Sequence, residues 1–250
     1  MAVPLSRASL PSRRAPDPGR TRDNDKAERL DTWINTTTYT TPELVLFGLG
    51  CVLWAVTYVD VLLAVRRVQF VEIPAVAVMA NVAWEFDWGF VLQTDMGMLF
   101  QWGYRIWFFL DVVITWALIR YMYARIDVPE VKRLAVPATL VFIVLWGVGL
   151  YFLRVQGIDN PTGAVSGYLL NVMMSGLYLG AMLTTRTPAL YSVLSAWCKG
   201  VGTGLISVFC VLHLPENRFL LTLCGTAALL DILYLTALYR RRAGLAAVTA

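Results

Sequence analysis

The sequence contains little charge. Only 15% of its 250 residues are charged and 58% are hydrophobic, whereas soluble domains carry roughly 25% charged residues. A soluble protein of this size needs a polar exterior, because its surface meets water. The shortage therefore excludes a soluble enzyme, a disulfide-stapled secreted domain and a nucleic-acid-binding protein. It indicates that a lipid bilayer covers most of the folded surface.

Metal-binding residues are scarce as well. The single histidine, His213, excludes a site built from several histidines. The four cysteines lie in apolar segments without CxxC or Cys/His metal spacing, so we interpret them as small core residues. The sequence predicts no metal site and no cofactor.

Long apolar runs recur along the chain. Seven runs of about 20 residues, the length that spans a bilayer, are expected at 43–65, 73–92, 104–123, 134–153, 162–183, 189–211 and 219–239. Only helices and closed barrels satisfy every backbone group in hydrocarbon, and the runs lack strand alternation. The predicted fold class is all-α, a polytopic membrane protein formed by a bundle of seven transmembrane helices.

The domain boundaries follow from the same pattern. Residues 1–42 form a polar N-terminal tail, which we expect to be disordered over 1–30. Residues 43–240 form the membrane domain, and 241–250 form a short C-terminal tail. Lys and Arg are more frequent on the side that holds the C terminus, which predicts a cytosolic C terminus. The bias toward Ala, Arg, Val and Gly suggests a bacterial source, and thus the cytoplasmic membrane.

Away from the ends of the apolar runs, six ionisable residues interrupt them: Asp60, Glu85, Asp87, Asp111, Lys199 and Asp231. A charge at the bilayer centre costs at least about 2.5–3.5 kcal/mol, so such residues usually face a bundle interior and serve a function. Asp60 is expected to form an interfacial ion pair with Arg66 and Arg67. The counted depths place Glu85, Asp111, Lys199 and Asp231 in one central layer.

Helical spacing gives these residues polar and aromatic neighbours, because positions i, i+3 and i+4 share a face. Asp87 lies about 200° around its helix from Glu85, so the two cannot face one pocket. The residues expected to line a site around the acids are Asn81, Trp84, Trp88, Tyr104, Trp107, Asp111, Asn171, Tyr178, Lys199 and Tyr234.

An acid beside aromatic rings suits one kind of chemistry. A carboxyl in an apolar pocket tends to stay protonated and can act as a general acid. Aromatic faces stabilise cations. Together they suit protonation of an alkene or epoxide followed by carbocation cyclisation. The purely structural alternative is that the carboxyls join neighbouring helices by hydrogen bonds and that the aromatic residues pack against helices or lipid.

A motif on the second span favours the catalytic interpretation. Asn81-Val82-Ala83-Trp84-Glu85-Phe86 resembles the N-x-x-W-E motif of the small seven-helix membrane terpene cyclases of meroterpenoid and indole-terpenoid biosynthesis. That family has an essential aspartate on its last span, which Asp231 matches. Arg105 with Asp111, and Lys199-Gly200-x-Gly202-Thr203, are further similarities. The resemblance covers about 43–240.

This resemblance implies a non-hydrolytic, metal-independent cyclisation of a prenyl chain that is already attached to an aromatic core. It implies Glu85 and Asp231 as the catalytic acidic pair, with Glu85 as proton donor and Asp231 sharing, holding or itself donating the proton. Asp111 and Asn171 would support them. The spans contain no DDxxD or DxDD run with which to ionise a diphosphate.

Within the family, the sequence resembles the bacterial drimentine-type enzymes, which cyclise farnesylated tryptophan-derived cyclodipeptides. The implied partners are therefore a prenylated aromatic or indole substrate and the lipid bilayer, without nucleic acid. The oligomeric state is left open. Asp87 departs from the family pattern, which has an apolar residue there, and its role is also open.

Three other functions compete with this one. A retinal protein needs a lysine on its last span, and 219–239 contains none. A small-solute or proton-coupled transporter usually has duplicated halves or broken helices, which we do not find. A receptor or assembly protein without catalysis is the third alternative.

Overall fold

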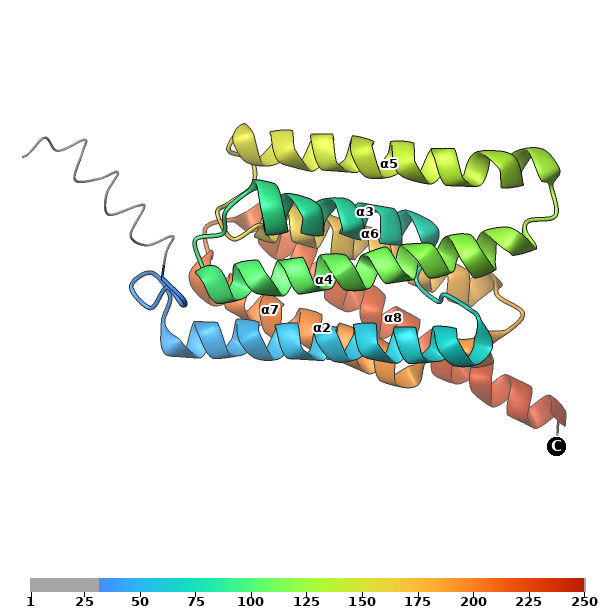
Figure 1. The fold of residues 1–250 in the computed structure, drawn as a ribbon. Helices are drawn as coiled ribbons and strands as arrows, with labels where there is room; N and C mark the ends of the chain where they lie inside the picture. The colour runs from blue at the N-terminus through green and yellow to red at the C-terminus, as the bar shows by residue number, and fades with distance from the viewer. Residues whose placement is uncertain (1–31, 250) are drawn as a thin grey trace, which may run out of the picture.

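The computed structural model describes residues 32–249, with side chains up to residue 244, so the segment 1–30 that we expect to be disordered lies outside the described residues. The described elements are helices that lie side by side (Figure 1). The α-helices are α2 (Thr41–Val68), α3 (Ala75–Phe86), α4 (Met98–Ala117), α5 (Pro129–Val155), α6 (Ala164–Thr184), α7 (Val193–His213) and α8 (Arg218–Thr249). Shorter segments are η1 (Asp87–Val91), η2 (Leu118–Met122), η3 (Tyr123–Arg125) and η4 (Pro188–Leu190).

Within the described part, six helices are long and apolar enough to cross a membrane. They are α2, α5, α6, α7, α8 and the continuous stretch Met98–Arg125, and they confirm an all-helical membrane fold. The expected second span, 73–92, forms the shorter helix α3, which continues as the π-helix η1. Neither piece reaches spanning length alone. The count of seven spans therefore stays a prediction.

Local sequence explains why α2 begins two residues earlier than expected. The Glu43 carboxylate accepts hydrogen bonds from the backbone N–H and the hydroxyl of Thr40, both at 2.7 Å. Pro42 lies in the first turn, where its missing N–H costs nothing. Hydrogen bonds from the capping residue to a Glu three residues later fix the start of a helix.

The residues before α2 are ordered where the structure describes them. Asn35 and Tyr39 are buried, and both bind Asp95 in the loop between η1 and α4: Asn35 through the Asp95 carbonyl (2.8 Å) and Tyr39 through its carboxylate (2.6 Å). The segment from 32 to 40 thus closes one end of the bundle. Short-range polarity in the sequence does not reveal these partners, which lie 56 to 60 residues away.

Small residues set the closest helix contact. α2 packs most extensively on α7, and a Cβ atom at Gly50 would lie 2.8 Å from the carbonyl oxygen of Gly202. The two backbones can approach this closely only because both positions are glycine, as is common where membrane helices meet. This contact holds α2 and α7 together.

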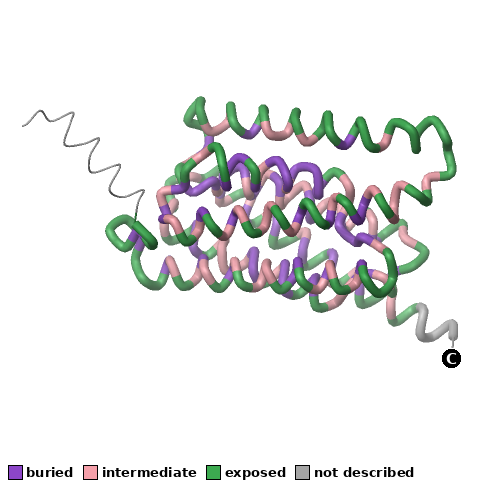
Figure 2. Tube along the Cα trace, in the orientation of Figure 1, coloured by how far each residue is buried: buried purple, intermediate pink, exposed green. Residues whose placement is uncertain are grey.

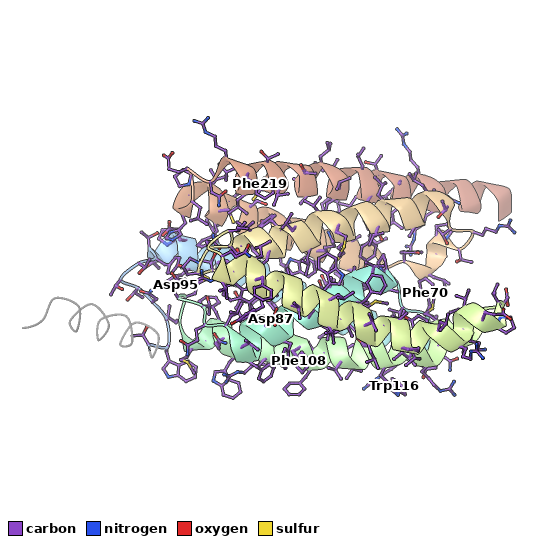
Figure 3. All side chains as sticks on the ribbon, turned by 90° about the horizontal axis from the view of Figure 1, so that it is seen from above. Phe70, Asp87, Asp95, Phe108, Trp116 and Phe219 are labelled. Atoms are coloured by element: carbon purple, nitrogen blue, oxygen red, sulfur yellow. The ribbon has the colours of Figure 1, made fainter. Side chains whose placement is uncertain are left out.

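The outer surface of the bundle is apolar. α5 lies on the periphery, with only Thr139 and Leu150 buried, and is drawn mostly as exposed in Figure 2. Large apolar side chains such as Trp116, which is 56% exposed, project from the rim (Figure 3). Such a surface suits contact with hydrocarbon.

The environment of Asp60 corrects a prediction. Its carboxylate accepts hydrogen bonds from the hydroxyls of Ser192 and Ser195, the latter at 3.0 Å, and forms no ion pair with Arg66 or Arg67 among the described residues. Ser192 caps the N-terminus of α7, where a negative charge is favoured by the helix dipole. The predicted interfacial ion pair of Asp60 with Arg66 and Arg67 is therefore wrong.

Glu72, in the loop between α2 and α3, joins the same end of α7. It is buried, and its carboxylate accepts a hydrogen bond from the Ser192 backbone N–H at 2.6 Å. Burial raises the pKa of Glu72 to about 7, although the bond from Ser192 acts in the opposite direction. This loop therefore carries a group that titrates near neutral pH.

We predict that Gly50→Val destabilises the α2–α7 contact by about 1–3 kcal/mol, the usual cost of overpacking a core. Thermal unfolding in detergent measures the loss. Gly48→Val is the matched control on the same helix, since a Cβ atom there meets nothing within 4 Å. Equal melting temperatures for the two variants would contradict the close contact.

Stability should also depend on pH through Glu72. Between its ordinary value of 4.5 and about 7 the folded protein holds a proton that the unfolded chain has lost, so this contribution to stability falls as pH rises through that window and is flat above it. Glu72→Gln should remove that part of the slope in melting temperature. The exposed Glu216→Gln should not, and an unchanged slope in Glu72→Gln would refute the assignment.

Candidate active site

A cavity lies inside the bundle between α2, α3, α4, α6 and α7 and encloses about 130 Å³. Its lining is mostly apolar and aromatic. The lining residues are Phe47, Cys51, Trp54, Tyr58, Asn81, Trp84, Glu85, Tyr104, Trp107, Thr162, Gly163, Ala164, Gly167, Tyr168, Leu170, Asn171, Met174, Thr203 and Ile206. Among the described residues, Glu85 contributes the only carboxyl group to this wall.

The carboxyl of Glu85 is held from behind by two other helices. The hydroxyl of Tyr58 on α2 lies 2.7 Å from Glu85 Oε1 and 3.0 Å from Asp111 Oδ2 on α4. The amide of Asn81, one turn before Glu85, reaches the same hydroxyl at 3.4 Å. The carboxyls of Glu85 and Asp111 also interact directly with each other. Glu85 thus belongs to a buried cluster of three side chains while forming part of the cavity wall.

Hydrogen counting shows what the cluster requires. The Tyr58 hydroxyl has one proton, so it can donate to Glu85 or to Asp111 but not to both. The second contact is a hydrogen bond only when that carboxyl is protonated and donates to the phenol oxygen. Two ionised carboxylates sharing one hydroxyl would also repel each other. The geometry of the three residues is therefore satisfied by one shared acidic proton.

Aromatic rings surround this acid in a continuous chain of contacts. Tyr58 stacks on Trp107 (centroids 6.4 Å apart, planes at 15°) and Trp107 contacts Tyr104 at 6.1 Å. Tyr104 meets the edge of Trp84 at 5.1 Å, and Trp54 lies 6.5 Å from Tyr58. The indole N–H of Trp84 donates to Ser166 at 2.7 Å, which fixes its ring. Ring faces of this kind stabilise a cation by about 0.5–2 kcal/mol each.

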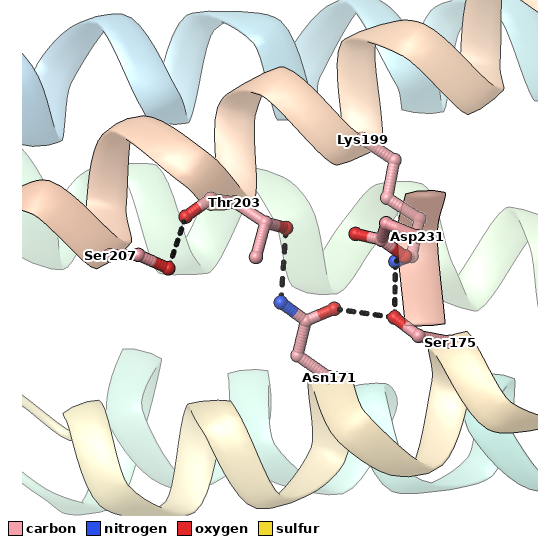
Figure 4. Close-up of polar contacts among 6 residues, drawn as sticks. All are labelled: Asn171, Ser175, Lys199, Thr203, Ser207 and Asp231. Carbon is pink, nitrogen blue, oxygen red and sulfur yellow. Dashed lines mark hydrogen bonds and ion pairs between the residues drawn. The ribbon is translucent and has the colours of Figure 1, made fainter. Parts of the chain in front are cut away.

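Asp231 belongs to a second buried cluster (Figure 4). Its carboxylate forms an ion pair with Lys199 at 2.6 Å, and Lys199 donates to Ser175, also at 2.6 Å. Ser175 contacts Asn171 at 3.5 Å, and Asn171 donates to Thr203 at 3.0 Å. Asn171 and Thr203 line the cavity. The ion pair is thus connected to the cavity wall without forming part of it.

The structure therefore divides the predicted site residues. Asn81, Trp84, Glu85, Tyr104, Trp107 and Asn171 line the cavity, whereas Trp88, Asp111, Tyr178, Lys199, Asp231 and Tyr234 do not. Glu85 and Asp231, expected as a pair, lie in separate clusters, in which Glu85 contacts Tyr58 and Asp231 contacts Lys199.

The residues away from the wall pack around it. Trp88 lies under Gly163, where a Cβ atom would come within 2.6 Å of its ring. Tyr178 and Tyr234 pack on each other in the core, with centroids 5.2 Å apart. These three aromatic side chains fill space between helices in the structure.

Asp87 faces away from Glu85, as its helical angle predicted. Its carboxylate lies against α5, 3.8 Å from the position of a Cβ atom on Gly147, and Figure 3 marks its place in the bundle. Asp87 Oδ2 has no hydrogen-bond partner among the described residues. Its surroundings give it no contact with the cavity.

Sequence reasoning missed the contribution of the first span. Cys51, Trp54 and Tyr58 all line the cavity from α2. Their spacing of three and four residues places them on one helix face, so the same pattern used for the other spans could have identified them. Among residues 32–249 no group of three His, Cys, Asp or Glu side chains could hold a metal ion; metal independence stays a prediction.

Fold and cavity define a helical integral membrane protein with a buried acid on the wall of an aromatic cavity. Residues 37–242 match the Pyr4-like transmembrane terpene cyclases, and the chain belongs to this family. Comparison with curated proteins and with solved structures gives no match. The family resemblance carried by the N-x-x-W-E motif is confirmed. The closer similarity to drimentine-type enzymes stays a prediction.

The Lys199–Asp231 pair makes a direct prediction about stability. Lys199→Met should lower the free energy of unfolding by about 3–5 kcal/mol, because it leaves a buried carboxylate unpaired. The double variant Lys199→Met/Asp231→Leu should recover part of this loss, since no buried charge remains. A thermal double-mutant cycle in detergent measures the coupling. Additive losses would show that the two groups do not pair.

Proposed function

We propose that this terpene cyclase catalyses a protonation-initiated, metal-independent cyclisation of the prenyl chain, most simply a farnesyl chain, of a prenylated aromatic or indole substrate. One observation carries the proposal: among the described residues, Glu85 is the only carboxyl on the wall of a cavity that is otherwise lined mostly by aromatic and apolar side chains. We further propose a bacterial cytoplasmic membrane as its location, from the bias of the sequence toward Ala, Arg, Val and Gly. The distribution of Lys and Arg supports a cytosolic C terminus.

The reaction begins with proton transfer from Glu85 to the terminal alkene or epoxide of the chain. An alkene forms a carbocation and an epoxide opens to an alcohol and a carbocation, while Glu85 becomes a carboxylate. Internal double bonds then attack in turn and close the rings. Loss of a proton from the last cation forms a new double bond and restores the proton count, so product and substrate have equal mass. The rings of Trp84, Tyr104 and Trp107 surround the chain during these steps.

Tyr58 and Asp111 support the acid. Asp111 does not line the cavity, so it acts on Glu85 and not on the substrate chain. Once Glu85 has given up its proton, the Tyr58 hydroxyl at 2.7 Å donates to the new carboxylate. Charge-assisted hydrogen bonds are roughly twice as strong as neutral ones, so this contact strengthens as the proton leaves. Asp111, on the other side of the hydroxyl, holds or supplies the shared proton.

We assign Asp231 as the second required acid, acting through its ion pair. Lys199 neutralises Asp231 and binds Ser175, which contacts Asn171 on the cavity wall. In this arrangement the pair fixes the polar side of the cavity and keeps an uncompensated charge away from the developing cation. Asp231→Asn should therefore impair cyclisation by disturbing Asn171, while Glu85 keeps its own partners.

Replacement of the acid tests the proposal. Detergent-solubilised protein in EDTA should convert a farnesylated indole, chosen from a panel of prenylated aromatics, to a product of equal mass with fewer double bonds. Glu85→Gln should lower the rate by at least about 10²-fold, the lower range for a lost general acid. Mass spectrometry and NMR of the product measure both results.

Asp87→Asn is the matched control, because Asp87 is a buried acid two residues further on that faces α5. It should retain activity, and Glu85→Gln should keep the wild-type melting temperature to within a few degrees. Normal turnover by both Glu85→Gln and Asp231→Asn would refute the acid assignment. If the whole panel stays unchanged while proteoliposomes take up solute, a transport function replaces this proposal.

A further inference from the structure

A second hollow lies on the outer surface between α2 and α4 and encloses about 560 Å³. Its lining is strongly apolar, and the residues are Ile34, Thr36, Thr41, Leu44, Val45, Gly48, Cys51, Val52, Leu99, Phe100, Gly103, Tyr104 and Trp107. We call it the α2–α4 groove. Val45, Val52 and Leu99 are 47–59% exposed, so the groove faces the surroundings of the bundle.

The groove and the cavity share a wall. Cys51, Tyr104 and Trp107 line both hollows. Trp107 stacks on Tyr58, which holds Glu85. The groove therefore leads from the outer face of the bundle to the aromatic rings beside the acid.

Two glycines keep the groove open. Gly48 on α2 and Gly103 on α4 line it, and a Cβ atom built on either meets nothing within 4 Å. α2 and α4 also touch each other far less than α2 touches α7. Space between two membrane helices is thus left unfilled at the point where larger side chains would fit.

The groove has a polar end and an apolar end. Thr36 and Thr41 lie where α2 begins, and Thr41 is exposed. Cys51 lies ten residues further along α2, which corresponds to about 15 Å of helix. An amphiphile that lies in one leaflet has the same polarity and orientation: a polar head at the interface and a chain that points toward the bilayer centre.

We propose that the α2–α4 groove is the lateral entrance and chain-holding site for the prenylated substrate. The aromatic head lies near Thr36 and Thr41, and the prenyl chain passes from the bilayer along Gly48 and Gly103 to the shared wall. The chain then enters the cavity past Cys51, Tyr104 and Trp107. This inference deepens the proposed function and rests on it for the identity of the occupant.

Filling the groove tests the entrance. Gly48→Phe and Gly103→Phe should each lower kcat/KM for a farnesylated indole by about tenfold or more, with melting temperatures near that of the wild type because both positions have open space. Gly149→Phe is the matched control. Gly149 is exposed on α5, lines neither hollow, and also has open space for a Cβ atom. Wild-type kcat/KM in both groove variants would overturn the proposal.

A binding experiment separates this inference from the proposed reaction. A farnesylated indole with a diazirine on its chain, irradiated with protein in phospholipid vesicles, should label α2 and α4 at the groove, and Gly48→Phe should abolish this labelling. Labelling without any cyclised product would support the groove and contradict the proposed function. Normal cyclisation with labelling elsewhere would overturn the groove. Equal labelling of the groove by a diacyl phospholipid that carries the same diazirine would identify a lipid site and also overturn it.

Discussion

A carboxyl group in the hydrocarbon layer of a membrane depends on hydrogen-bond or ion-pair partners from its own protein, because lipid offers none. The helices of this protein are arranged around that requirement. Tyr58 from α2 joins Glu85 of α3 to Asp111 of α4, and Lys199 of α7 joins Asp231 of α8 to α6 through Ser175. Four contacts between helices thus meet at two polar clusters, and the aromatic cavity lies between elements that these clusters hold in place.

The fold follows from the sequence to the extent that it depends on local patterns. Apolar runs bounded by charges and prolines predict where each helix lies. The ends differ by two residues at the start of α2, where the Thr40–Glu43 contact sets the cap, and by ten residues at the end of α8. The periodicity of a single helix also predicts that Glu85 and Asp87 face opposite sides. The expected second span is less regular, because α3 continues as a π-helix that no hydropathy pattern indicates.

The pairing of the buried groups could not be predicted in the same way. The sequence places Glu85, Asp111, Lys199 and Asp231 at one depth, but which of them meet depends on helix order and rotation around the bundle. Those are set by contacts such as Gly50 on Gly202, whose backbones are 152 positions apart in the chain. The residue pattern of one helix does not indicate which helix packs against it. Resemblance supplied Asp231 as an important acid, and geometry adds that its partner is Lys199 rather than Glu85.

The ion pair between α7 and α8 also has a consequence for biosynthesis. Lys199 leaves the ribosome before Asp231, so α7 reaches the lipid with an ammonium that has no counter-ion, at a cost of at least about 2.5 kcal/mol on insertion scales. α8 brings the missing carboxylate. The last two helices are therefore expected to leave the translocation machinery as a hairpin. The Lys199–Asp231 ion pair is then already formed when this hairpin packs against the earlier helices.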